Sequence, residues 1–353
     1  RIRAECGQSV RTLSIGPAGE NLSRIATIQT ASTSVAGQGG FGAVMGSKKL
    51  KAISVIGTGR VPVADPEKLT WLYRAVGDEV RTHPGRHHDL ATRRKRLEQE
   101  VGGTARLYAC TASCPTPCKF VYSDVPSTSG DGKLSGVMSC VSALFPGKHG
   151  PVYDWNLGFR AGFEQNMHGN RLGLNHWDLI IGMVPWLRTC HSLGLLEQIN
   201  GRPMQWDSPQ FWSELLHDIA YRRGDGDALA EGGWRAPRLL GVGQEIVPRY
   251  YTGWGFAGHW DGHADYINHI VYPFWVAGVL QWAMDTRDPM SSMHGYVQSV
   301  MSWGPFGRGT VSWDQMRAIG EHVYGRADVL DRLSGYEGKA IPAAYHQRRA
   351  IMQ

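Results

Sequence analysis

Three cysteines within nine residues constrain the fold of this chain more than any other feature of its sequence. Cys110, Cys114 and Cys118 stand in Cys-Thr-Ala-Ser-Cys-Pro-Thr-Pro-Cys, where two prolines disfavour a helix. Three thiolates on one such loop can reach three irons of a cubane iron–sulfur cluster. The alternatives are inert cysteines and structural zinc, which usually takes a paired C-x-x-C with further ligands nearby. The spacing favours the iron–sulfur cluster over either alternative.

Composition indicates a globular protein of a reducing compartment. The chain has 353 residues, 42% of them hydrophobic, which is enough for two or three domains with cores of their own. It begins at Arg1 without a signal peptide, and Pro273 and Gln281 interrupt its longest apolar run, residues 270–284. We therefore expect a soluble, cytoplasmic protein with no membrane contact, whose crowded cysteines bind metal rather than form disulfides.

The charge of the chain is mildly basic. Lys and Arg number 37 against 31 Asp and Glu, and no long basic block occurs, so nothing indicates binding to nucleic acid. The excess fits an ordinary solvated surface, or a docking face for an acidic partner such as a ferredoxin.

The pattern of turns and apolar residues predicts an α+β chain that is mostly helical. Strand signals over residues 12–15 and 51–56 flank the glycine-rich stretch 37–42 and a short helix over 43–50. We expect residues 1–61 to be the C-terminal part of an α/β cofactor-binding domain, because these few elements cannot close a core alone.

Helical spacing dominates the rest of the chain. We expect one largely helical domain over residues 62–250 and a second, incomplete one over 251–353. Helices are predicted over residues 66–81, 178–195 and 208–221, the last with a cap and first turn at Asp207-Ser208-Pro209.

The glycine-rich stretch suggests a second cofactor. Gly37-Gln-Gly-Gly-Phe-Gly42 fits G-x-G-x-x-G, in which glycines let backbone amides approach phosphate. An NAD site would place an acidic residue at the end of the following strand, and residues 51–56 carry none. The same physics serves other phosphate-bearing cofactors, which we favour over NAD.

Several motifs in order make the resemblance to one family specific. The stretches Ile15-Gly-Pro-Ala-Gly-Glu-Asn21 and Ala36-Gly-Gln-Gly-Gly-Phe-Gly-Ala-Val-Met-Gly-Ser-Lys-Lys-Leu-Lys-Ala-Ile53 resemble the aldehyde:ferredoxin oxidoreductase family almost continuously. Asn170-Arg-Leu-Gly-Leu-Asn175 is similar to the family's D-x-x-G-L-D motif, and Ile219-Ala-Tyr-Arg-Arg-Gly224 and Leu229-Ala-Glu-Gly232 also match.

The resemblance implies tungsten or molybdenum held by two pyranopterins. The matched residues are Gln38, Gly39 and Gly40 at the first pterin, and Asn170, Gly173, Leu174 and Asn175 at the second. The family commonly has Arg in place of Gln38, and Asp at one or both ends of the second motif. These differences remove charge where phosphate and pterin hydrogen bonds are expected.

The resemblance also implies a 4Fe-4S cluster on the cysteine triplet. The family's fourth cysteine lies in a later D-x-x-G-L-C motif, which is absent before Gln353, and the family has a longer N-terminal portion. We therefore expect the chain to be an internal fragment whose fourth cluster ligand lies beyond residue 353.

Three further residues match positions near the metal. His294 stands in a segment similar to the one that places a His there, and imidazole can donate or accept a proton near neutral pH. Arg287 is expected at a pterin or phosphate, or in a surface ion pair. Cys140 falls where a cysteine ligates tungsten in class II benzoyl-CoA reductases; a buried inert cysteine is the alternative.

A mononuclear iron at a dimer interface is a further implied site. Dimeric family members hold it with E-x-x-H residues of both subunits, and the matched candidates are Glu164 and His217. Glu214-Leu-Leu-His217 shows that spacing, although surface residues on one helix face explain the pair equally well.

The sequence thus predicts an oxidoreductase that oxidises an aldehyde to a carboxylic acid. Electrons would pass through the cluster to ferredoxin or an electron-transfer subunit, in a homodimer or hetero-oligomer. The alternatives are a low-potential reductase of an aromatic acyl-CoA, suggested by Cys140, and a cofactor-free scaffold paralogue, suggested by Gln38, Asn170 and Asn175. We expect five aromatic residues to line either an apolar substrate channel or a core: Trp254, Phe256, Trp260, Trp275 and Trp282.

Overall fold

The protein, seen in a computed structural model, divides by its internal contacts into two compact units, Arg1–Tyr251 and Thr252–Gln353. The predicted domain boundaries near residues 61 and 250 stay predictions. The structure describes residues 2–30, 35–59, 62–82, 90–109, 119–138, 145–149, 153–249, 251–252, 255–256, 311–331, 337–342, 344–345 and 348.

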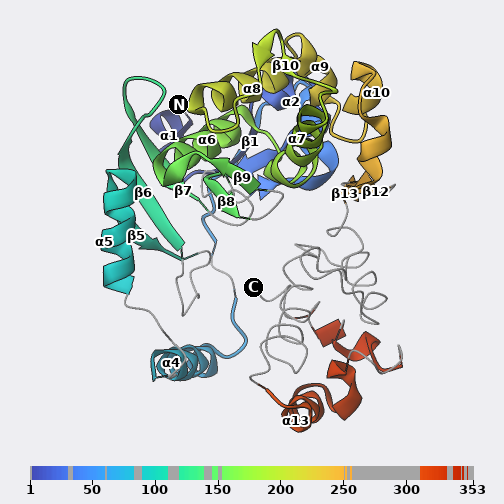
Figure 1. Ribbon diagram of the computed structural model, residues 1–353. Coiled ribbons are helices and arrows are strands. Elements are labelled where there is room, and N and C mark those ends of the chain that lie inside the picture. The colour runs from blue at the N-terminus through green and yellow to red at the C-terminus, as the bar shows by residue number, and fades with distance from the viewer. Residues whose placement is uncertain are drawn as a thin grey trace. The chain divides into compact units, whose positions relative to one another are not determined.

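A small antiparallel sheet begins the first unit (Figure 1). Its strands, in spatial order, are β3 (Val35–Ala36), β2 (Ile28–Thr30), β1 (Arg11–Ile15) and β4 (Ala52–Val55). Leu13 of the central strand β1 pairs with Thr30 on one side and Ile53 on the other. The strands predicted over residues 12–15 and 51–56 are confirmed.

Two short helices pack against each other beside this sheet. They are α2 (Pro17–Glu20) and α3 (Phe41–Ser47), and Pro17 occupies the start of α2, where its missing amide hydrogen costs nothing. The helix predicted over residues 43–50 thus begins earlier, within the glycine-rich stretch at Phe41, and ends earlier, at Ser47.

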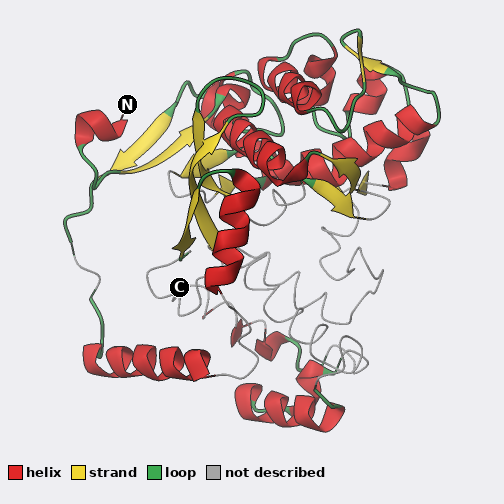
Figure 2. Ribbon diagram, turned by 60° about the vertical axis from the view of Figure 1, so that its left-hand side comes forward, coloured by secondary structure: helices red, strands yellow, loops and turns green. Residues whose placement is uncertain are grey.

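A second antiparallel sheet lies within the region predicted to be largely helical. It joins β5 (Thr104–Tyr108), β6 (Lys119–Pro126) and β7 (Lys133–Val137), and α5 (Leu90–Val101) packs against it (Figures 1 and 2). Phe120, Tyr122 and Val125 are buried in one cluster with residues of α5 and of the following helix. The sequence did not predict this sheet, although β6 has eight residues and residues 127–132 join it to β7 by a short turn.

Helices form the centre of the first unit. In chain order they are α6 (Gly158–Leu172), the π-helical segment η3 (Trp177–Met183), α7 (Val184–Ser192) and α8 (Pro209–Tyr221). The helix predicted over residues 178–195 thus consists of two parts, the π-helical η3 followed by the α-helix α7. Trp155, Trp186 and Trp212 are fully buried in this region, and each donates its indole N–H to a backbone carbonyl oxygen.

The start of α8 follows the sequence pattern. The Ser208 hydroxyl accepts a hydrogen bond from the Phe211 amide at 3.2 Å, and Pro209 begins the helix. The helix predicted over residues 66–81 is confirmed as α4 (Pro66–Thr82). Short elements complete the unit: α1 (Ile2–Cys6), β8 (Gly147–His149), β9 (Tyr153–Asn156), β10 (Gln198–Ile199), β11 (Arg202–Pro203), α9 (Asp225–Ala230), α10 (Ala236–Leu240) and η4 (Gln244–Arg249).

The described part of the second unit centres on α13 (Trp313–Tyr324), which packs against η5 (Ala327–Leu330). Ser312 and Gln315 form a capping box at the start of α13. Lys339 is buried, and its ammonium donates to three backbone carbonyl oxygens at 2.8 to 3.0 Å. Two-residue strands at the unit boundary are β12 (Tyr251–Thr252) and β13 (Gly255–Phe256).

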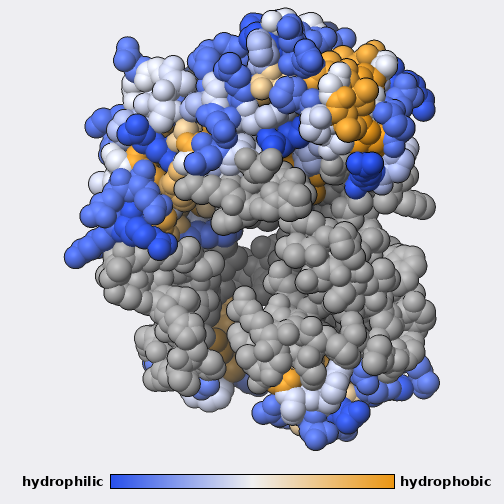
Figure 3. Space-filling model, in the orientation of Figure 1, coloured by the Kyte–Doolittle hydropathy of each residue, from blue (hydrophilic) through white to orange (hydrophobic). Residues whose placement is uncertain are grey.

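The surface of the described residues is mainly hydrophilic (Figure 3). On the face drawn there, a hydrophobic area is visible near α10. Exposed large hydrophobic residues include Leu193, Leu195 and Leu239. Among the helices of the described ranges, none has the length and apolar character needed to cross a bilayer.

Candidate cofactor-binding site

The glycine-rich loop of residues 37–42 lies directly on the backbone of residues 24–27. Gly40 has a φ of 66°, in the left-handed region that favours glycine. A Cβ atom at Gly40 would lie 2.5 Å from the carbonyl oxygen of Arg24, and one at Gly42 would lie 2.6 Å from that of Thr27. The loop can take this place only because these positions carry no side chain.

The turn after α6 pairs with the same segment. Gly173, with a φ of 80°, ends the helix, and its carbonyl oxygen accepts the Thr27 amide hydrogen at 2.9 Å. Two residues later, the Asn175 amide donates to the carbonyl oxygen of Ile25 at 2.9 Å. The backbone of residues 24–27 therefore contacts both motifs that the sequence analysis assigned to pterins.

The two motifs also meet each other. The Asn175 Oδ1 atom lies 3.4 Å from the place that a Cβ of Gly37 would occupy, and it accepts the Trp177 amide hydrogen at 3.0 Å. We call residues 24–27, 37–42 and 172–175 the glycine junction. Motifs far apart in the sequence thus become one site through backbone contacts.

The predicted pterin residues differ in what they can offer a ligand. Gln38, Gly39 and Gly40 form the short helix η1 (Gln38–Gly40), in which Gly39 is exposed and Gly40 buried. Asn170 is half-buried, and its amide donates to Asn166 Oδ1 at 3.4 Å. Leu174 is buried, so only its backbone can face a ligand. The exposed backbone at Gly39 is where this loop could approach a phosphate-bearing group, whereas Gly40 and Gly42 are buried against the backbone of residues 24–27.

Charged residues hold the segment that leads into the junction. Glu231 pairs with Arg24 at 2.5 Å and with Arg222 at 2.6 Å, and Arg222 donates to the carbonyl oxygen of Leu22 at 2.8 Å. Burial opposes ionisation of Glu231, but the bonds from both arginines outweigh it and lower its pKa. The family-matched stretches that contain Arg222 and Glu231 therefore position residues 22–24, a role that the sequence alone did not reveal.

Glu164 is a buried carboxylate with its own set of partners. Ser127, Thr128 and Ser129, in the turn between β6 and β7, supply hydroxyl and amide donors to its two oxygens. Burial raises the pKa of Glu164, but these hydrogen bonds outweigh burial and bring it to about 2. Glu164 and residues 127–129 are called the Glu164 cluster below. The run of three hydroxyl residues at 127–129 is a sequence signal for the Glu164 cluster.

The predicted iron ligands Glu164 and His217 stay predictions, because a bridging iron would take ligands from two subunits. His217 is exposed and stacks on Tyr221 with ring centroids 5.8 Å apart. The imidazole that reaches Glu164 is instead His168, whose Nε2 lies 3.9 Å from a Glu164 oxygen. Within the described ranges, no three His, Cys, Asp or Glu side chains are grouped so that they could hold a metal ion.

The remaining predicted site residues lie outside the described residues. They are Cys110, Cys114, Cys118, Cys140, Arg287 and His294, together with Trp254, Trp260, Trp275 and Trp282 of the predicted channel. Of the other cysteines, Cys190 is buried, and burial raises the pKa of its thiol to about 11. A thiol that stays protonated is a poor metal ligand.

The fold and the glycine junction together define a class of protein. It is an α+β protein in which two motifs predicted to bind a cofactor meet through backbone contacts at glycines. The chain belongs to the aldehyde ferredoxin oxidoreductase family. The model of that family's N-terminal domain matches residues 1–57, and the model of its domains 2 and 3 matches residues 87–251. Together the two matches cover more than half of the chain.

Curated relatives agree with this membership. A tungsten-containing aldehyde ferredoxin oxidoreductase of Pyrococcus horikoshii is 29% identical over 296 residues, which is 74% of this chain and 48% of the relative. An aliphatic sulfonate oxidoreductase, WOR-like subunit, of Pyrococcus furiosus is 30% identical, over 63% of this chain and 39% of the relative. The chain spans about half the length of the first of these and less of the second.

A solved structure shares the fold. It is a chain of the active-site complex BamBC of benzoyl coenzyme A reductase, in complex with 1,5-dienoyl-CoA. The TM-score is 0.54 at 23% identity, over 70% of this chain and 42% of that chain. This likeness supports the α+β architecture predicted from the sequence.

Proposed function

We propose that the whole protein is a tungsten- or molybdenum-pterin oxidoreductase that oxidises an aldehyde to a carboxylic acid. The reaction consumes one aldehyde and one water and gives the acid, two protons and two electrons. The observation that supports the proposal is the glycine junction, in which both family pterin motifs pack on the backbone of residues 24–27. When bound, the metal–pterin group supplies the two-electron redox chemistry and the route for oxygen from water.

The chain's own residues bind and orient that group. Gly39, which is exposed, would let the backbone approach the group closely, and the side-chain oxygen of Asn175 is fixed because it accepts the Trp177 amide hydrogen. Neutral side chains at Gln38, Asn170 and Asn175 can donate and accept hydrogen bonds without bringing a charge. His294 is proposed to move a proton near the reacting carbonyl, and Arg287 to bind phosphate or pterin, both from the family match.

Electron transfer completes the proposal. Cys110, Cys114 and Cys118 would hold three irons of a 4Fe-4S cluster, with a fourth ligand beyond residue 353. Electrons would then leave singly to ferredoxin or to a partner subunit in the cytoplasm. A homodimer or a hetero-oligomer is compatible with this route. A bridging iron at the dimer interface, held by Glu164 and His217 as the family match implies, is a further part of the proposal.

The decisive experiment measures metal in the full-length protein, produced anaerobically with tungstate and molybdate supplied. We expect about one tungsten or molybdenum with four or more irons per chain, together with aldehyde-dependent reduction of a viologen dye. A folded full-length protein without any metal would contradict the proposal and favour the cofactor-free scaffold. Iron alone would remove the pterin assignments but leave a cluster protein.

A matched pair of variants tests the junction itself. Asn170→Leu removes a half-buried amide whose internal bond is long, 3.4 Å, so the fold should persist while retention of the heavy metal falls. Arg171→Leu changes its exposed neighbour on the same turn and should leave metal content unchanged. Equal metal content in both variants would contradict a pterin contact at Asn170.

A second candidate function is the low-potential reduction of an aromatic acyl-CoA, which Cys140 favours as a soft metal ligand. Reduction of benzoyl-CoA by a low-potential donor, without aldehyde oxidation, would support it. Cys140→Ser should then abolish that activity. If aldehyde oxidation survives the same substitution, the first candidate is supported.

A further inference from the structure

The helix α5 carries its charges in an order that its own stability does not favour. Its first half exposes three basic residues, Arg94, Lys95 and Arg96, and its second half carries Glu98 and Glu100. The dipole of a helix favours acidic residues near its start and basic residues near its end. The first turn of α5 has no acidic residue and its last turn no basic one. The order of the charges therefore has a cause outside the helix.

The sheet beside α5 brings further basic residues to the same end. The chain reverses at residues 102–103, so the last residues of β5 lie at the same end of this region as the start of α5 (Figure 1). Arg106 on β5 is exposed, and Lys119, the first residue of β6, is half-buried. These two side chains share one face of the sheet, because Arg106 pairs with Val121 and Lys119 with Tyr108. The five basic residues are called the basic end: Arg94, Lys95, Arg96, Arg106 and Lys119.

The charges of the basic end are poorly balanced within the chain. Arg96 pairs with Glu100 at 3.7 Å, and among the described residues no carboxylate forms an ion pair with the other four basic residues. The acidic residues Asp124 and Asp131 lie near the turn between β6 and β7, at the other end of β6. Positive charge is therefore concentrated where β5 ends and β6 begins.

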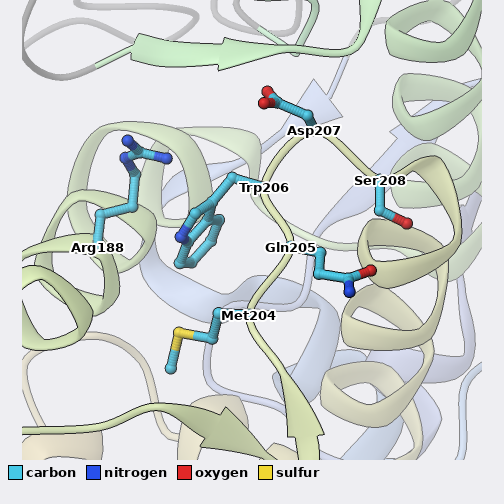
Figure 4. A pocket seen from close by; sticks show the side chains of 6 residues that line it. All are labelled: Arg188, Met204, Gln205, Trp206, Asp207 and Ser208. Carbon is cyan, nitrogen blue, oxygen red and sulfur yellow. The ribbon is translucent and has the colours of Figure 1, made fainter. Parts of the chain in front are cut away.

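The cavity at residues 204–208 shows the contrasting case of a balanced charge (Figure 4). It has a volume of about 480 Å³, and Arg188 lines it together with that segment. The guanidinium carbon of Arg188 lies 5.3 Å from the centroid of the Trp206 ring and 5.7 Å from that of Trp155. Burial lowers the pKa of Arg188, and the attraction of Asp207 opposes that shift. The positive charge in the cavity is thus balanced inside the molecule, unlike those of the basic end.

We propose that the basic end is the docking surface for a small, acidic electron-transfer protein. The proposal rests on the proposed function, because the stretch predicted to hold the cluster, residues 110–118, begins after Ala109 and ends before Lys119. Carboxylates of the partner meet basic side chains from a helix and two strands, which speeds encounter and sets the orientation of the complex. The exposed Leu107 offers an apolar contact among these charges. At each encounter one electron passes from the cluster to the oxidised cluster of the partner.

Binding of an acidic 4Fe-4S ferredoxin to the full-length protein tests the proposal. Biolayer interferometry measures the dissociation constant at several salt concentrations, and it requires no turnover. We expect the dissociation constant to rise about tenfold between roughly 50 and 300 mM salt, because salt screens contacts between exposed charges. Absence of binding, or binding that does not depend on salt, would overturn the proposal.

Charge-reversal variants locate the surface. Arg94→Glu combined with Lys95→Glu should weaken ferredoxin binding at least about tenfold, and Arg106→Glu, on a different element, about threefold. Arg235→Glu combined with Arg238→Glu makes the same change of net charge at exposed positions and should alter binding less than about twofold. Equal weakening by the two double variants would show a general effect of net charge and refute the assignment.

Reduction of a viologen dye by the wild-type protein separates this proposal from the proposed function. Dye reduction together with salt-independent ferredoxin binding would overturn the docking surface and leave the proposed function standing. Absence of dye reduction, together with binding that is lost in the Arg94→Glu and Lys95→Glu double variant, would overturn the proposed oxidation and leave the docking surface standing.

Discussion

The glycine junction and the Glu164 cluster both join segments distant in the chain, but by opposite means. At the junction, backbone meets backbone, and the essential property of Gly40, Gly42 and Gly173 is the lack of a side chain. At the cluster, one buried side chain collects hydroxyl and amide donors from a distant turn.

The difference between the two regions concerns what a residue matched to a family position does in this chain. A Cβ at Gly40 or Gly42 would lie 2.5 or 2.6 Å from a backbone carbonyl oxygen, so this chain requires glycine at both positions. A carboxylate has no such constraint, and Glu164 is used here to hold the β6–β7 turn against α6. Identity of a residue with a family position is therefore stronger support for a backbone role than for a ligand role.

The largest effect is expected from a substitution that disturbs the close backbone contacts of the glycine junction. Gly42→Ala places a methyl group 2.6 Å from the Thr27 carbonyl oxygen, and we expect it to lower the free energy of unfolding by about 3 kcal/mol. Gly57→Ala is the matched control, because no atom lies within 4 Å of its added Cβ, and it should change stability by less than about 0.5 kcal/mol. Urea denaturation followed by circular dichroism measures both. Equal stability of the two variants would refute the steric account.

A smaller effect is expected at the buried carboxylate. Glu164→Gln keeps the shape of the side chain but removes its charge, and we expect it to lower the free energy of unfolding by about 2 kcal/mol at neutral pH. The pKa of Glu164 is lowered from 4.5 to about 2 in the folded protein, so its stabilisation is complete above pH 4.5 and is lost as the pH falls toward 2.

Denaturation of both proteins across that pH window measures the effect. The stability difference between wild type and Glu164→Gln should shrink on acidification, whereas Glu67→Gln, at an exposed site, should track the wild type throughout. A pH-independent difference would show that Glu164 is not held as a carboxylate.

One hydroxyl group of the Glu164 cluster should contribute less to the free energy of unfolding than the Glu164 charge does. Ser129 donates its hydroxyl hydrogen to Glu164 at 2.8 Å, and Ser129→Ala should cost about 1 kcal/mol. Ser192→Ala removes an exposed hydroxyl that bonds within its own helix, and is expected to be nearly neutral. In the Glu164→Gln background the Ser129→Ala cost should fall, which a double-mutant cycle measures.

The smallest effect is expected at the predicted iron ligand on the surface. His217→Ala should change the free energy of unfolding by less than about 0.5 kcal/mol, and the iron content of the full-length variant tests the bridging iron. Loss of one iron per dimer in this variant would support the bridging-iron hypothesis.

Much of the local structure could be predicted because its causes are local. The strand before Gly16, the turn at residues 37–42 and the cap at Ser208 each follow from residues within a few positions. The sheet of β5, β6 and β7 could not, because its stability arises from burial against α5 and α6 rather than from a strong pattern in any one strand.

The sequence by itself determined the family motifs, the cysteine triplet and the glycine positions, since these are written in residue types at fixed spacing. Only the tertiary structure decided which of them meet. It placed residues 24–27 between the two pterin motifs, gave Glu164 its hydroxyl partners, and set Arg188 between two indoles. Such contacts depend on how distant segments close on one another, and short-range periodicity carries no information about that geometry.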